Sequence, residues 1–235
     1  MQTIFSRNEK KYIITQAQAD RLTTKLSEFM KPDKYSTYWV QNLFYDTENW
    51  DMIHTSMEKP HYKEKMRMRC YGTIDETDRV FLELKKKYAG VVYKRRIPIT
   101  PADILTLPMD EILQKDDSQN SRELAYHIER TGVKEKFFLA YHRHAFSGIV
   151  DEDLRLTIDS DIYYRLDNLD FTQAITDGVA LDPELYLLEI KTSFGIPLWL
   201  TSLLGELSIF PTSFSKYAAC FTHFMTNKQQ VIRSA

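Results

Sequence analysis

The sequence predicts an α+β protein, a closed eight-stranded antiparallel β-barrel, or tunnel, with flanking α-helices. Three observations support this prediction. Apolar and polar residues alternate with the period of a β-strand in segment after segment. Charged residues occupy the polar positions of most of these segments, so they share one face of the sheet. Closure removes the edges of an open sheet, turns the charged faces inward and leaves the apolar exterior for helices to cover.

The elements are expected in a regular order along the chain. The predicted strands are 7–14, 38–46, 63–71, 78–88, 91–99, 136–147, 153–161 and 184–192. The predicted helices are 15–30, 101–107, 119–131, 196–208 and 213–227. Thr15 with Gln18 forms a capping-box pattern, Thr100 precedes a proline at a first helical position, and Gly132 is a common helix end. The segments 116–120 and 168–183 are expected to be exposed loops.

Length and composition predict one domain that spans residues 1–235. With 43% hydrophobic and 13% aromatic residues, the chain can bury a core. The two cysteines, Cys70 and Cys220, exclude a disulfide framework and a cysteine zinc site. We expect a cytoplasmic protein with no signal peptide and no transmembrane segment, because the longest apolar stretch, 194–205, is short and contains Pro197. The near balance of 31 basic and 33 acidic residues argues against nucleic acid as a partner.

The charges on the strand faces are mostly basic. The basic residues that share these faces are Arg7, Lys11, Lys65, Arg67, Arg69, Lys85, Lys87, Lys94, Arg96, Arg143, Arg155, Lys191 and, in the last helix, Lys216. The acidic residues that share them are Glu9, Glu83, Asp153, Asp159 and Glu189. One such strand is more often a solvated face over an apolar core, so the argument depends on the whole set. Cations gathered on a concave wall repel one another unless an anion lies between them, so we interpret the wall as a polyanion site.

Carboxylates recur among these cations. Glu9, Glu83 and Glu189 each stand two residues before a lysine, in a Glu-x-Lys pattern. A wall that binds only anions has no use for a carboxylate, because the carboxylate would repel the ligand. These three residues are therefore predicted to bind a divalent metal, Mn²⁺ or Mg²⁺, that bridges phosphate oxygens. Salt bridges within the wall are the alternative interpretation.

The ordered series of motifs resembles the triphosphate tunnel metalloenzyme superfamily and, within it, the catalytic domain of the vacuolar transporter chaperone (VTC) polyphosphate polymerases. The resemblance extends from Arg7 to Tyr217, over nearly the whole chain. The motifs that carry it are Arg7-Asn-Glu-Lys-Lys-Tyr12, Lys65-Met-Arg-Met-Arg-Cys-Tyr-Gly72, Phe81-Leu-Glu-Leu-Lys85, Val92-Tyr-Lys-Arg-Arg-Ile-Pro98, Tyr141-His-Arg-His-Ala-Phe146, Arg155-Leu-Thr-Ile-Asp159, Leu188-Glu-Ile-Lys191 and Phe214-Ser-Lys-Tyr217.

The resemblance implies roles for individual residues. The phosphate chain would be bound by Lys11, Arg67, Arg69, Lys85, Lys94, Tyr141, Arg143, Arg155 and Lys216. Lys65 and Lys191 lie on the same strand faces and complete the predicted binding set. Glu189 would be the principal metal ligand. The residues predicted to be catalytic are Lys11, Arg67, Arg69, Lys85, Lys94, Arg143 and Glu189.

The activity that the resemblance implies is metal-dependent transfer of the terminal phosphate of ATP to a growing polyphosphate chain inside the tunnel. Hydrolysis of triphosphate or short polyphosphate is the first alternative, and a non-catalytic polyphosphate or nucleotide sensor is the second. Related hydrolases begin with Glu-x-Glu-x-Lys, whereas Arg7 stands at the first position here and favours the polymerase. Ser213 replaces a lysine that many members carry, so one contact to the product is missing. The expected ligands are ATP, triphosphate and polyphosphate, and a membrane-protein partner is left open.

Overall fold

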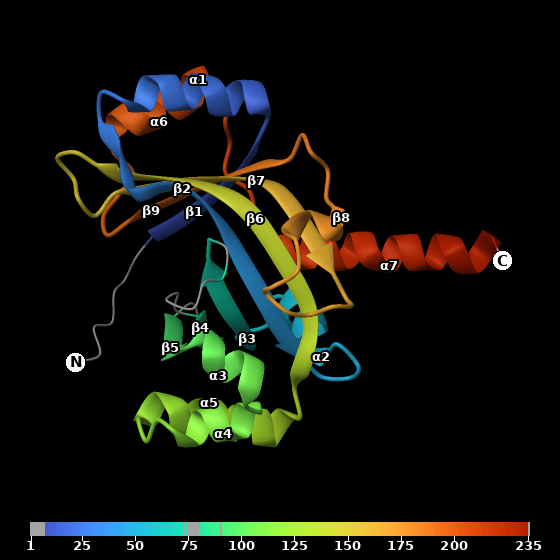
Figure 1. Cartoon of the computed structure of the whole chain (residues 1–235). Coiled ribbons are helices and arrows are strands. Elements are labelled where there is room, and N and C mark those ends of the chain that lie inside the picture. The colour runs from blue at the N-terminus through green and yellow to red at the C-terminus, as the bar shows by residue number, and fades with distance from the viewer. Residues whose placement is uncertain (1–7, 73, 75–79, 90, 235) are drawn as a thin grey trace. The chain divides into compact units, whose positions relative to one another are not determined.

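The structure is a computed structural model that describes residues 8–72, 74, 80–89 and 91–234 (Figure 1). Its strands are β1 (Asn8–Ile14), β2 (Met30–Asp46), β3 (Tyr62–Tyr71), β4 (Val80–Tyr88), β5 (Val91–Ile99), β6 (Lys134–Gly148), β7 (Arg155–Arg165), β8 (Val179–Ala180) and β9 (Tyr186–Thr192). Its helices are α1 (Gln16–Leu26), α2 (Asp51–Met57), α3 (Pro101–Thr106), α4 (Met109–Gln114), α5 (Gln119–Thr131), α6 (Leu198–Glu206) and α7 (Lys216–Ser234), with one 3₁₀ turn, η1 (Ile175–Asp177). The prediction of an α+β chain with an antiparallel sheet and flanking helices is confirmed.

The sheet of the described residues is open. Its strand order is β1-β9-β7-β6-β2-β3-β4-β5, with β8 paired to β7, so β1 and β5 are the two ends of the order. The prediction of a closed eight-stranded barrel is therefore wrong in its closure. The outer edge of β1 pairs with the segment around Thr212, whose amide donates to the Lys11 carbonyl at 2.7 Å. An edge that is already paired in this way is protected without closing the sheet.

The chain forms two compact units, each with its own core. Unit 1 contains Met1–Tyr38, Tyr141–Ile162 and Ala180–Ala235, and unit 2 contains Trp39–Ala140 and Tyr163–Val179. Strands β2, β6 and β7 contribute residues to both units. The single domain over 1–235 stays a prediction.

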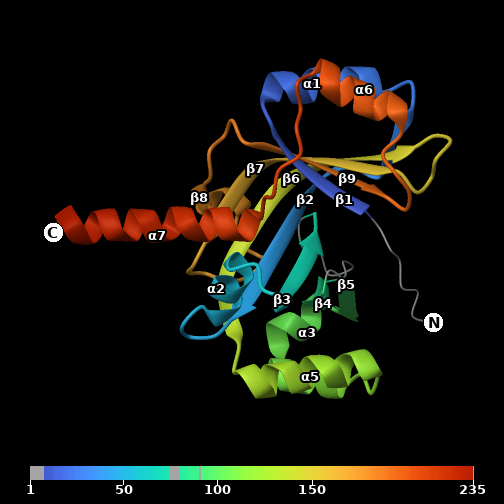
Figure 2. The same cartoon turned by 180° about the vertical axis from the view of Figure 1, so that it is seen from behind.

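Unit 1 packs two helices on one face of its strands, as both views of the cartoon show (Figures 1 and 2). α1 begins with the predicted capping box, in which the Thr15 hydroxyl accepts from the Gln18 amide at 3.2 Å and the Thr15 amide donates to the Gln18 side chain. The core between helices and strands contains Leu22 and Leu26 of α1, Leu200 of α6 and apolar residues of β1, β7 and β9. α1 ends at Leu26, so the predicted helix was too long, and its last predicted residue begins β2.

Unit 2 is built on the antiparallel series β3, β4 and β5. Alternate residues of β3 are buried, as in Met66, Met68 and Cys70, whereas the charged residues between them are half-buried. The apolar face packs against α5, which contributes Leu124. α5 ends at Gly132 with a positive φ of 65°, the left-handed conformation that glycine adopts without strain. Helices α2 and α4 of this unit were not predicted.

The C-terminal segment belongs to unit 1 and ends in α7. Tyr217, Cys220 and Phe221 are buried there, but Phe210, which precedes the helix, is 71% exposed. Phe210 therefore contributes little to the packing of the last helix. Across the described residues, none of the helices combines the length and the apolar character needed to cross a bilayer.

Candidate functional site

The predicted site residues, with the exception of Arg155, fall into two charged clusters, one in each unit. The Glu83 cluster of unit 2 contains Lys65, Arg67, Arg69, Glu83, Lys85, Lys94 and Arg96, all from β3, β4 and β5. The Asp159 cluster of unit 1 contains Glu9, Lys11, Tyr141, Arg143, Asp159, Glu189, Lys191 and Lys216, from β1, β6, β7, β9 and α7.

Glu83 is the buried centre of its cluster and contacts three cations. Antiparallel register places Arg67 and Arg96 on either side of it. Arg67 Nη2 lies 2.9 Å from Oε2, Lys94 Nζ lies 2.5 Å from Oε1 and Arg96 Nε lies 3.1 Å from Oε1. Burial alone raises the pKa of Glu83, but the cations, Arg67 first, lower this pKa to about 2. The carboxylate is therefore ionised at neutral pH.

One carboxylate cannot neutralise the cations around it. The same register places Lys65, Lys85 and Lys94 side by side on three neighbouring strands. Like charges directly opposite one another in a sheet are destabilising. On the described part of these three strands, Glu83 shares the charged face with the six cations Lys65, Arg67, Arg69, Lys85, Lys94 and Arg96. The cluster therefore has the charge to bind a polyanion.

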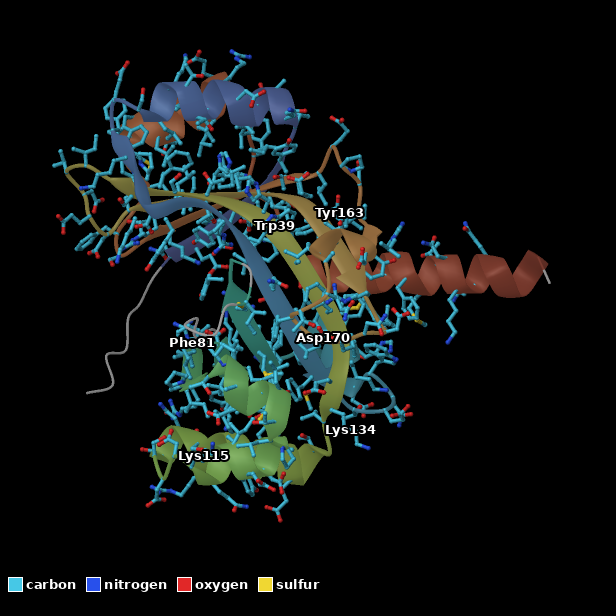
Figure 3. All side chains as sticks on the ribbon, in the orientation of Figure 1. Trp39, Phe81, Lys115, Lys134, Tyr163 and Asp170 are labelled. Atoms are coloured by element: carbon cyan, nitrogen blue, oxygen red, sulfur yellow. The ribbon has the colours of Figure 1, made fainter. Side chains whose placement is uncertain are left out.

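Two of the arginines are held in place by neutral groups. Arg69 Nε donates to the Asn42 side-chain oxygen at 2.8 Å, and the buried Asn42 amide donates in turn to the Leu139 carbonyl. The Arg96 guanidinium lies 3.4 Å from the ring centre of Phe81, which is labelled in Figure 3. Fixed guanidinium groups lose less conformational entropy when they bind phosphate. The sequence predicts Arg96 as part of the charged wall but assigns it no role of its own, and it does not predict Asn42.

Asp159 is the buried centre of the cluster in unit 1. Its side chain has no solvent exposure. Arg143 donates to it twice, from Nε at 2.6 Å and from Nη2 at 2.8 Å, and Lys216 Nζ lies 2.5 Å from Oδ2. Burial raises the pKa of Asp159, but Lys216 and Arg143 lower this pKa to about 2. The alternation in the sequence predicts Asp159 on the charged face but does not indicate its role.

Tyr141 completes the environment of these two cations. Lys216 Nζ lies 4.4 Å from the centre of the Tyr141 ring, and the Arg143 guanidinium carbon lies 5.2 Å from it. An aromatic face stabilises a cation without neutralising its charge. The ring therefore positions Lys216 and Arg143 while leaving their remaining donors for an anion.

Glu189 lies on β9 beside the lysine-bearing strand β1. It forms an ion pair with Lys191 and stands opposite Lys11 in the sheet register. Burial raises the pKa of Glu189, but Lys191, Lys11 and Lys216 lower this pKa to about 2. A cavity of about 30 Å³, enough for one water molecule, is lined in part by Lys11, Glu189 and Lys216.

The three predicted metal ligands are divided between the two units. Glu83 belongs to unit 2, where both of its oxygens contact cations, so it does not fit a metal ion. Glu9 and Glu189 lie on adjacent strands of unit 1, and Glu9 forms an ion pair with Lys11 at 3.1 Å. In the part of the chain that the structure describes, no three His, Cys, Asp or Glu side chains form a group that could hold a metal. Mg²⁺ needs only one or two carboxylates when substrate phosphates supply further oxygens, so Glu189 with Glu9 fits that ion.

Two further residues complete the comparison with the sequence. Arg155 is exposed and forms an ion pair with Asp33 at 3.1 Å. Its predicted role in phosphate binding would require Arg155 to exchange this partner for an anion. Arg7, which was taken to favour a polymerase, lies outside the described residues.

Comparisons with known proteins agree with the fold. The VTC domain family matches residues 6–225 of this chain. The PH1819 protein from Pyrococcus horikoshii OT3 superimposes with a TM-score of 0.50 and 15% identity, over 92% of this chain and 98% of that chain. HpAC1 from Hippeastrum, assigned as an adenylyl cyclase and described as having a dominant triphosphatase activity, superimposes with a TM-score of 0.53 and 20% identity, over 89% of this chain and 92% of that chain. At these identities the two structures show the fold alone. No curated protein sequence matches this chain.

Proposed function

Since this chain belongs to the VTC domain family, we propose that it is a metal-dependent polyphosphate polymerase that uses ATP. The observation that carries the proposal is the Glu83 cluster, in which three neighbouring strands bring six cations to one face and three of them contact the buried carboxylate. In the reaction, a terminal oxygen of polyphosphate attacks the γ-phosphorus of ATP, the bond from that phosphorus to the β,γ-bridging oxygen breaks, and ADP leaves. Such a transfer depends on positioning and on neutralising phosphate charge more than on acid–base chemistry.

The cations have distinct parts in this proposal. Arg67 and Arg69 present guanidinium groups, which can bind phosphate oxygens through two parallel hydrogen bonds. Lys65, Lys85 and Lys94 are point charges that lie in one row across the sheet. In unit 1, Lys11, Arg143, Lys191 and Lys216 offer a second set of phosphate donors. A divalent ion held by Glu189 with Glu9 would neutralise further phosphate charge.

Hydrolysis of triphosphate or short polyphosphate is the second candidate. In this reaction water replaces polyphosphate as the attacking group, and the same cations would bind the phosphates. The triphosphatase activity named for HpAC1 supports it as an alternative. A sensor that binds polyphosphate or nucleotide without turnover is the third. A cytoplasmic location and a membrane-protein partner remain part of the proposal.

Incubation of the protein with ATP and Mn²⁺ or Mg²⁺, followed by gel electrophoresis of the products, separates the candidates. Long polyphosphate supports the polymerase, release of phosphate alone supports the hydrolase, and binding without either product supports the sensor. Arg67→Ala should reduce triphosphate affinity about tenfold or more, because a guanidinium contact to phosphate is lost. The matched control is Arg21→Ala, at an exposed position of α1. Equal affinity in the two variants would remove the Glu83 cluster from the proposal.

A further inference from the structure

A groove in unit 2 lies outside both charged clusters, along the seam between α4 and α5. Lys115, labelled in Figure 3, marks the connection between these two helices. The groove has a volume of about 540 Å³, which lies in the range of ligand-binding pockets. Its floor is apolar and is formed by Met109 and Leu113 of α4 and by Ala125 and Ile128 of α5.

The floor lies at the margin of the apolar face of α5. Leu124 and His127 are buried in the core of unit 2. Ala125 and Ile128, one position further along, lie on the neighbouring face and are only partly buried. Ala125 is small, so a backbone packed against α5 could approach closely at this position. Ala125, Ile128 and Met109 pack on the margin of the core, where part of their apolar surface stays accessible in the groove.

The rim of the groove is acidic. Asp110, Asp116, Asp117 and Glu129 line it, against one basic residue, Arg122. Arg122 forms an ion pair with Asp117 at 2.7 Å. Among the described residues no cation forms an ion pair with Asp110 or Glu129. An apolar floor under uncompensated negative charge is complementary to a surface that is apolar along one stripe and basic beside it.

We propose that this groove binds a basic amphipathic helix of a partner protein. Apolar side chains at positions i, i+4 and i+7 of such a helix would fill the floor, and its lysines and arginines would face the acidic rim. A helix suits the site better than an extended strand, because the groove is bounded by two helices and offers no strand edge. A small polyamine would satisfy the acids but would leave the apolar floor in water.

Methyl-labelled protein tests this proposal directly, because every residue of the floor carries a methyl group. The probes are two synthetic helical peptides with the same leucine stripe, one with lysines and the other with glutamates on its polar side. We expect the lysine peptide to shift the NMR methyl signals of Met109, Leu113, Ala125 and Ile128, and to bind about tenfold or more tightly than the glutamate peptide. Equal binding of the two peptides, or shifts confined to other methyl groups, would overturn the proposal.

Variants locate the binding and separate it from folding. Ala125→Arg should abolish the shifts, whereas the matched control Ala102→Arg, at an exposed position of α3, should not. Asp110→Asn combined with Glu129→Gln changes two exposed side chains, so it should weaken the lysine peptide severalfold without lowering Tm. If the double variant binds the lysine peptide as tightly as the original chain, the acidic rim has no role and the proposal fails. If the same methyl signals shift with protein concentration alone, a second copy of the chain occupies the groove instead.

Discussion

Replacing Asp159 with asparagine removes the charge that holds Arg143 and Lys216 together while preserving the shape of the side chain. In the folded protein, two largely buried cations would then lose the carboxylate that contacts both of them, and Glu189 would be the acidic group left to interact with them. We expect the variant to be less stable in the absence of ligand. We also expect tripolyphosphate to raise its Tm by more than it raises that of the original chain, because the added anion replaces the missing charge.

The size of the effect follows from the pKa of Asp159. Its fall from 3.8 to about 2 on folding corresponds to about 2 kcal/mol in favour of the folded state at neutral pH. Removing one partner of a buried ion pair costs about 3–5 kcal/mol, an upper limit here because the side chains of Arg143 and Lys216 keep 11% and 17% exposure. We therefore expect a loss of about 2–3 kcal/mol, or a fall in Tm of about 5–10 °C.

The pH dependence provides the check. Because the folded pKa of Asp159 lies below the unfolded value, its stabilisation is fully present above pH 3.8 and is lost as the pH falls toward 2. Urea unfolding of both proteins should give a stability difference that is full at pH 7 and shrinks below about pH 4. Asp20→Asn, at an exposed position of α1, is the matched control. A variant as stable as the original chain at pH 7, or a difference that does not depend on pH, would refute the reasoning.

Four further outcomes are expected. Glu83→Gln should lower stability by a similar amount, about 2–3 kcal/mol in urea unfolding, because three cations lose their shared counterion; an unchanged midpoint would contradict this. Glu189→Gln should abolish metal-dependent turnover while metal-free binding of triphosphate survives in calorimetry, and full activity would mean that Glu189 is only a partner for wall lysines. Stability of the original chain should fall between about pH 4.5 and pH 2, since the pKa of Glu83 and that of Glu189 are also lowered to about 2; a flat urea midpoint over that range would be inconsistent with it. Burial raises the pKa of the Cys220 thiol to about 12, so iodoacetamide at pH 8 should modify it in urea and not in the native protein, as mass spectrometry can measure.

The strands could be predicted because the residues of a buried face recur at every second position of the local sequence. The two missed helices show where local sequence is insufficient. α2 follows Trp50, which has a left-handed backbone and provides no side-chain cap. Instead the amides of Met52 and Ile53 donate to the carboxylate of Asp46, at 2.8 and 3.0 Å. That cap lies at the end of the preceding strand, so a search for an N-cap directly before the helix does not find it.

The charges of the candidate site were predictable, but their partners were not. Alternation places Glu83 on the charged face, yet only strand register shows that Arg67 and Arg96 stand on either side of it. The Glu-x-Lys spacing therefore suggested that Glu83 binds a metal. In the structure its carboxylate instead forms ion pairs with cations. Closure of the sheet was unpredictable for a related reason. An edge strand and an inner strand alternate in the same way, and nothing local to β1 shows that Thr212 pairs with it.

The pairing of β1 with β9 has a consequence for synthesis on the ribosome. Tyr12 and Ile14 of β1 are buried against residues that are translated nearly a whole chain later, because Tyr12 pairs with Leu188 and Ile14 with Tyr186. Leu22 of α1 shares a core with Leu200 of α6, which is also translated much later. The hairpins of β3, β4 and β5, by contrast, pair with immediate neighbours and can form as they emerge. A nascent chain therefore exposes the apolar side of β1 and α1 until β9 and α6 have been synthesised.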